Sequence, residues 1–161
     1  MTASAILAAL SACLCETLED MDRPAPCFCG VVPGTLVIPD MFEDCGGGRN
    51  GVAWVRIAAT YPSQTVGVAY QNVGNCSSGI GYDIEVGVVR EHSDYYEADT
   101  IDADDSAAIV QWQVDDMEAV RRAIVCCDSL DEKDFILGMY QPIGPQGGLV
   151  GGAWMVHVSV V

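Results

Sequence analysis

The chain has 161 residues, of which 50% are hydrophobic, so it is long enough and apolar enough to fold around one buried core. Its 23 acidic side chains against 7 basic ones give a formal net charge of −16. Because a surface this acidic repels phosphate groups, the composition argues against a module that binds DNA, RNA or anionic lipid non-specifically. No apolar run approaches the ~20 residues that a membrane-spanning helix requires, and we expect one domain over residues 1–161 without membrane contact.

The first segment, residues 4–13, reads SAILAALSAC and ends like the cleavage box of a bacterial lipoprotein signal. No Lys or Arg precedes its apolar core, and that core (residues 5–10) is shorter than that of an ordinary signal peptide. The alternative is an amphipathic helix, because apolar side chains recur at steps of three and four: Ile6, Leu10, Cys13, Leu14, Leu18 and Met21. We therefore predict a core-facing helix that Ser4 caps and that ends before Pro24 and Pro26.

Eight cysteines require an explanation: Cys13, Cys15, Cys27, Cys29, Cys45, Cys76, Cys126 and Cys127. Without a secretory signal, the chain is expected to fold in a reducing compartment, where disulfides are rare. Zinc is the sharper alternative, because Cys27, Cys29 and Cys45 could supply three thiolates. Zinc sites usually use C-x₂₋₄-C pairs, however, whereas two of the close pairs here are C-x-C and the third, Cys126 and Cys127, is adjacent. We predict no bound zinc and no disulfide, with most thiols buried as small apolar side chains.

The middle of the chain is predicted to form strands. Residues 31–38 are a strand candidate interrupted by Pro33-Gly34, and residues 51–60 alternate Val52, Trp54 and Arg56 against Ala53, Val55 and Ile57. Residues 61–79 are predicted to be a long loop or a projecting hairpin. Residues 80–90 form the clearest strand, with Ile80, Tyr82, Ile84, Val86 and Val88 on one face and Asp83 and Glu85 on the other. We expect the first face to be packed and the second to be wet or shared with a partner.

Residues 91–105 carry seven acidic side chains in fifteen positions and lead into a second predicted helix. Asp104 suits its N-cap, and Arg121 and Arg122 suit its last turns. The predicted apolar face is Ile109, Trp112, Met117, Val120, Ile124 and Cys127. We expect Trp112 and Ile109 to pack over Ile84 and Val86 in the core.

The chain ends in two predicted strands, residues 135–140 and 153–161, joined by a segment with five glycines in residues 144–154. A phosphate-binding loop would need a following Lys, and a dinucleotide-binding loop would need a following helix. Neither is present, so we predict that the glycines form a wide hairpin connection with positive φ and close backbone contacts. The order of elements predicts an α+β fold, a mostly antiparallel sheet with two helices on one face, ending in a β-hairpin.

No arrangement of residues indicates an enzyme. His157 and Ser159 share one strand face, but side chains two apart on a strand lie ~7 Å apart, too far for direct proton transfer. His92 has no recognisable nucleophile beside it, and the acidic stretch lacks the order of ligands that a calcium-binding loop needs. We predict no catalytic, cofactor-binding or metal-binding residues, and expect the acidic stretch to be a solvated surface.

Three segments together resemble a known family. They are GVAWVRIAATYPS (51–63), IEVGVVR with DMEAVRRAIVCC (84–90 and 116–127), and LGMYQPIGPQGGLVGGAWMVHVSV (137–160). They are similar to small actinobacteriophage neck proteins, the tail terminators or head-to-tail connectors of long-tailed phages. The closing segment is the most specific part, whereas the acidic stretch has no counterpart in the family pattern.

The resemblance implies a ring, commonly a hexamer, that ends the tail tube and docks it to the head-side connector or stopper protein. It implies a virion protein of the neck, present in the host cytoplasm during assembly, with no catalytic residues. Acidic segments facing the channel would let genomic DNA pass without binding. Two alternatives stay open: a stopper or head-completion protein bound to the portal, and a cysteine-dependent metal-binding module.

Overall fold

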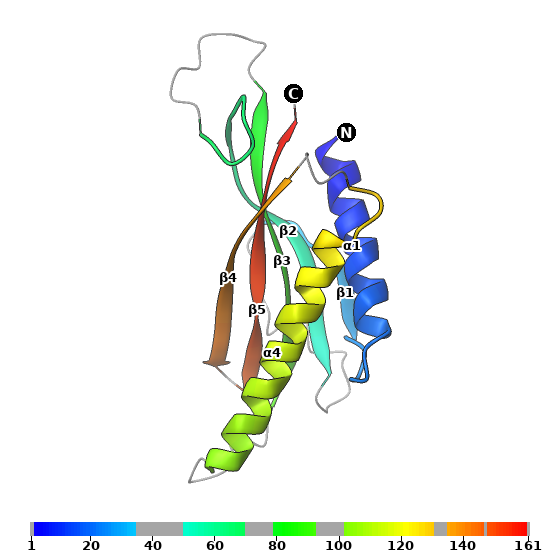
Figure 1. Cartoon of the computed structure of the whole chain (residues 1–161), viewed down its shortest axis with the longest axis vertical. Helices are drawn as coiled ribbons and strands as arrows, with labels where there is room; N and C mark the ends of the chain where they lie inside the picture. The colour runs from blue at the N-terminus through cyan, green and yellow to red at the C-terminus, as the bar shows by residue number, and fades with distance from the viewer. Residues whose placement is uncertain are drawn as a thin grey trace.

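The computed structural model describes residues 2–34, 50–69, 79–92, 102–130, 135–146 and 148–160. One sheet has the spatial order β1 (Phe28–Val31), β2 (Gly51–Pro62), β3 (Ile80–Glu91), β5 (Leu149–Val160) and β4 (Phe135–Gln146). All neighbouring strands are antiparallel except β1 and β2. Two helices, α1 (Ala3–Glu19) and α4 (Ala103–Val125), cover one face of the sheet (Figure 1). The predicted α+β fold is therefore confirmed.

The predicted first helix is present, but its N-cap lies two residues earlier than expected. Thr2 is the N-cap, and its hydroxyl accepts a hydrogen bond from the amide of Ala5, while Ser4 lies inside the helix. The helix ends at Glu19, before the two prolines. Its predicted apolar face is correct, because Ile6, Leu10, Leu14 and Leu18 are all buried.

The main core lies between the helices and the sheet. Its buried side chains come from one face of each central element: the four buried α1 residues, Ala53 and Val55 of β2, Ile84, Val86 and Val88 of β3, Val156 and Val158 of β5, and Ala119, Val120, Ala123 and Ile124 of α4. The alternation predicted for β2 and β3 is thus confirmed for the central residues of this face, whereas Ile80 at the start of β3 is 42% exposed and Ile57 of β2 is half-buried. Burying aliphatic side chains of this size contributes about 1.5–3 kcal/mol each, so this layer supplies the main stabilisation of the fold.

The structure corrects the prediction for the first half of α4. Only its second half reaches the core, and Trp112 and Ile109 are merely half-buried, with Trp112 outside both apolar clusters. The Trp112 ring instead lies beside arginines, 4.1 Å from the guanidinium carbon of Arg23 and 5.5 Å from that of Arg90. Its N-cap is Asp102, not Asp104, and its first turns extend past the end of the sheet (Figure 1). Apolar side chains on turns that extend past the sheet have no sheet surface to pack against.

Replacement of Trp112 by Ala is therefore expected to cost about 1–2 kcal/mol rather than the ~3–5 kcal/mol typical of a core tryptophan. The loss comes from its cation–π contacts and from partial burial, without a closed cavity. Urea unfolding of the variant measures the difference. A loss above about 3 kcal/mol would show that Trp112 belongs to a core after all.

The glycine-rich segment forms strand rather than a wide connection. β4 extends to Gln146 and β5 begins at Leu149, and these two residues pair across a tight turn. Gly151 and Gly152 lie inside β5, where an added Cβ would collide with the carbonyl oxygen of Val88 and with the Tyr140 ring respectively. Gly144 and Gly148 have φ of 91° and 75°. The expected close contacts and positive φ are present, but the predicted boundaries of both strands were too short.

The remaining predicted strand is displaced. β1 ends at Val31, so it overlaps the predicted strand at residues 31–38 by one residue, and residues 35–38 lie outside the described part. β2 extends beyond its predicted end to Pro62, and a bridge joins Thr65 and Val68 within the predicted loop or hairpin.

Neither described helix is both long and apolar enough to cross a bilayer.

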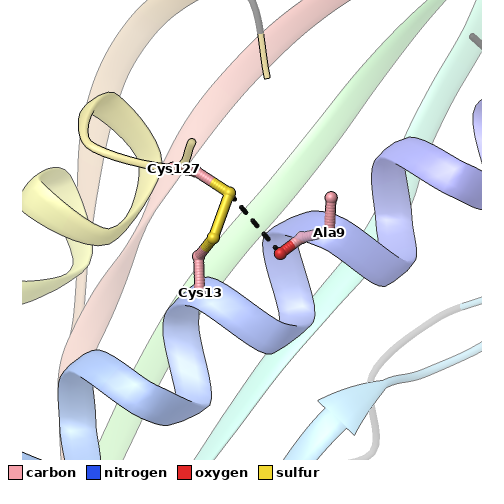
Figure 2. The surroundings of a disulfide bond; sticks show 3 residues. All are labelled: Ala9, Cys13 and Cys127. Carbon is pink, nitrogen blue, oxygen red and sulfur yellow. Dashed lines mark hydrogen bonds between the residues drawn. A yellow bond between two sulfur atoms is a disulfide. The ribbon is translucent and has the colours of Figure 1, made fainter. Parts of the chain in front are cut away.

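The prediction of free thiols was wrong. Cys13 forms a disulfide with Cys127, and Cys15 forms one with Cys29, each with Cα atoms 5.7 Å apart. Figure 2 shows the first, which ties α1 to the end of α4, with the Cys127 sulfur 3.6 Å from the carbonyl oxygen of Ala9. Cys27 is also disulfide-bonded. Residues two apart on a helix point to different sides, so Cys13 and Cys15 reach two different elements. Cys126 is free and exposed.

Candidate assembly surfaces

The face of the sheet away from the helices is less open than its sequence pattern predicts. A second apolar cluster lies on it, formed by Val52, Trp54, Val89 and Ala153, and Trp54 is fully buried. The carboxylate of Glu85 accepts hydrogen bonds from the Trp54 indole at 2.7 Å and from two nitrogens of Arg56 at 2.8 Å each. Arg56 and Glu85 face each other across β2 and β3. This half of the face is occupied by internal contacts and is not a wet surface.

Further along the same face, the side chain of Asp83 on β3 contacts residues of both neighbouring strands, β2 and β5. One oxygen of its carboxylate accepts a hydrogen bond from the Tyr61 hydroxyl at 3.0 Å and lies 2.7 Å from Nδ1 of His157. His157 is therefore paired, and its side chain is 28% exposed. The hydroxyl of Ser159 is buried and has no hydrogen-bond partner among the described residues, so His157 and Ser159 form no base–nucleophile pair. The cluster therefore links β2, β3 and β5 through the carboxylate of Asp83.

Two tyrosines, Tyr61 and Tyr140, are expected to ionise at a higher pH than a free tyrosine. Burial, followed by the hydrogen bond to Asp83 and its charge, raises the pKa of Tyr61 to about 12. Burial and then the charge of Asp116 raise the pKa of Tyr140 to about 12. Because the unfolded phenol ionises near pH ~10, the folded state holds more protons between those values, and stability falls as the pH rises from 10 towards 12. The absorbance of phenolate during a rapid alkaline titration measures the ionisation of the tyrosines. Replacing both tyrosines by Phe should remove the part of the absorbance change that occurs near pH 12. Titration of all six tyrosines near pH 10 would contradict it.

A buried ion pair fixes α4 to the sheet. Arg90 of β3 is fully buried, and it donates to both oxygens of Asp116 at 2.7 and 2.9 Å and to the carbonyl of Pro24 at 2.6 Å. Burial raises the pKa of the Asp116 carboxyl, and the guanidinium beside it opposes that shift. His92, expected in an acidic loop, is only 4% exposed and meets the Trp112 ring edge-on at 5.7 Å. The buried arginine therefore ties α4 to β3 and to the chain that follows α1.

The two edges of the sheet have an unusual composition. In the sequence, residues 24–34 around β1 and residues 135–161 across β4 and β5 contain no Asp, Glu, Lys or Arg, although the chain carries a charge of −16. In the described part of the chain, β1 pairs only with β2, and β4 only with β5. The two exposed large apolar residues of β4 are Ile136 (50%) and Met139 (76%). Charge is one of the devices that protect an exposed edge from pairing with another chain, and neither edge has it.

The predicted acidic surface lies mostly outside the described residues, which include Glu91, His92 and residues 102–105 of that stretch. Asp102, Asp104 and Asp105, at the start of α4, are exposed. Among the described residues, no group of three or more His, Cys, Asp or Glu side chains is placed to hold a metal ion. Cys27 and Cys29, two of the three ligands considered for zinc, are disulfide-bonded and offer no thiolate.

No family model matches the chain, and no curated protein matches it.

Proposed function

We propose that the chain is a structural subunit of a phage neck, forming a closed ring, with six copies expected, that ends the tail tube and joins it to the head-side connector. The observation that carries the proposal concerns residues 137–160, which bear the most specific part of the family resemblance. These residues lie in the β4–β5 hairpin, and β4 is an uncharged edge of the sheet with exposed apolar side chains. A lone domain has little reason to keep such an edge.

The disulfides support a place in the virion. Disulfides persist on virion surfaces and in other oxidising surroundings, whereas a protein confined to the cytosol rarely retains them. A neck protein folds in the host cytoplasm but spends its later life in the released particle. The disulfides also disfavour the alternative of a cysteine-dependent metal-binding module, since they remove Cys27 and Cys29 from any thiolate site.

Ring formation should depend on salt. Each subunit carries −16, so neighbouring subunits repel one another at low ionic strength. The Debye length falls from ~30 Å at 0.01 M salt to ~10 Å at 0.1 M, which weakens this repulsion. We expect the purified chain to sediment as a monomer at low salt and to associate as salt is added. Association that weakens with salt would show that charge attraction, rather than apolar contact, joins the subunits.

Antibody labelling of intact particles tests the place of the protein. We expect label only at the junction of head and tail, and on purified tails that carry no head. Label on heads that lack tails, with none on free tails, would instead identify a stopper or head-completion protein bound to the portal. Label elsewhere on the particle, or none, would contradict the proposal.

A further inference from the structure

The charges of this sheet are arranged in reverse of the usual order. Ordinary sheets place charged side chains, especially Lys, on their edges and keep the inner strands apolar. Here the inner strands β2 and β3 carry all the charged residues of the sheet: Arg56, Asp83, Glu85, Arg90 and Glu91. The edge strands β1 and β4 carry none. In a chain of charge −16, these edges are where a second copy can approach against the least repulsion.

We propose that β4 of one copy pairs with β1 of the next, so that the sheet continues from subunit to subunit around the ring. The inference rests on the proposed ring and names the surfaces that close it. The occupant of each edge is thus the other edge of a second copy of this chain. Two different surfaces meet in such a contact, which is the type of interface that generates rings.

The strand directions fit this pairing. β1 runs parallel to β2, β2 antiparallel to β3, β3 antiparallel to β5, and β5 antiparallel to β4. The two edge strands therefore run in opposite directions within one subunit. Rotation about an axis roughly along the strands keeps these directions, so β1 of the next copy would lie antiparallel to β4. Antiparallel pairing is slightly the more stable of the two arrangements per residue.

The first half of β4 is the part whose backbone groups are available to pair with another strand. Pro142 and Pro145 lack the amide hydrogen that a partner strand would need, which leaves residues 135–141 for pairing. A register shift interrupts the ladder with β5 between Leu137 and Tyr140, and the highly exposed Met139 lies there. On the other edge, Val31 is 45% exposed. The contact would thus consist of backbone hydrogen bonds with a few apolar side chains on each side.

Complementary edge variants test the pairing. Ile136→Lys with Met139→Lys places charge on β4 and leaves β1 intact, while Val31→Lys does the reverse. Val110→Lys with Val114→Lys is the matched control for the first, because these α4 side chains are 55% and 43% exposed and the charge change is the same. Circular dichroism and thermal melting confirm that each variant is folded. Sedimentation at raised salt measures association, and hydrogen exchange measures edge protection.

We expect each edge variant to raise the concentration for half-association by at least about tenfold, a change of ~1.4 kcal/mol, while the control associates like the wild type. Mixing the two edge variants should give one-to-one dimers and nothing larger, since only one compatible pair of edges remains. Amide exchange at residues 28–31 and 135–141 should slow when the wild type associates.

A wild-type chain that stays monomeric at all salts, or edge variants that associate like the control, would overturn the pairing. Loss of association in the β4 variant alone would show a two-fold β4–β4 contact in its place. None of these results depends on where the protein lies in the particle. Antibody labelling at the neck can thus succeed while edge pairing fails, and the reverse.

Discussion

Replacement of Asp116 by Ala is expected to destabilise the domain by about 3–5 kcal/mol, because it leaves the guanidinium of Arg90 buried without its counter-charge. Arg90 is fully buried, and Asp116 supplies two of its three hydrogen bonds. Urea unfolding with linear extrapolation gives the change in the free energy of unfolding. The α4 helix should lose its attachment to β3 first, since this ion pair is a buried link between them.

Two further variants isolate the cause. Asp115→Ala removes the partner of Arg23, a pair whose side chains are 25% and 32% exposed, and should cost less than about 1 kcal/mol. Arg90→Met combined with Asp116→Leu removes both charges and should recover most of the loss. If Asp116→Ala lowers the free energy of unfolding no more than Asp115→Ala does, water hydrates the Arg90 guanidinium when its partner is removed.

Removal of the Cys13–Cys127 disulfide should cost about 2–5 kcal/mol, and more than removal of Cys15–Cys29. The first joins residues 114 apart in sequence and the second residues 14 apart, so the first restricts the unfolded chain more. Both cysteines of a pair are replaced by Ala, because the free thiol of neighbouring Cys126 could otherwise re-pair with Cys13. Thermal and urea unfolding measure the losses.

Cys126→Ala is the control and should change stability by no more than ~0.5 kcal/mol, since this side chain is exposed and unbonded. If neither double variant differs from this control, the disulfides do not constrain the fold. Equal losses from the two disulfides would show that the unfolded chain retains structure that already brings α1 near the end of α4.

Local periodicity in the sequence predicted the elements but not how they cross. The steps of α1 identified its buried face, and the alternation in β2 and β3 identified the central residues of theirs, because these parts lie over the core. The same pattern failed for Trp112, which lies outside the core in the first half of α4, whose first turns extend past the end of the sheet. Periodicity reports which residues share a face, and the crossing angle decides how much of that face is buried.

The sequence could not predict contacts between residues far apart in the chain, because such contacts also depend on how the elements cross. Cys13 and Cys127 could be joined only because the end of α4 lies beside the middle of α1, which no spacing along the chain reveals. The absence of charge in residues 24–34 and 135–161 is visible in the sequence, but it gains meaning once β1 and β4 prove to be the sheet edges. The glycines of β5 misled because they permit close strand packing as readily as they permit turns.

An image reconstruction of the head–tail junction is the most direct test of the proposed ring. We expect a closed ring of six copies of this chain at the end of the tail tube, with exposed acidic segments facing the channel. A single asymmetric copy, a ring whose channel wall is basic, or a particle without this chain at the neck would contradict it.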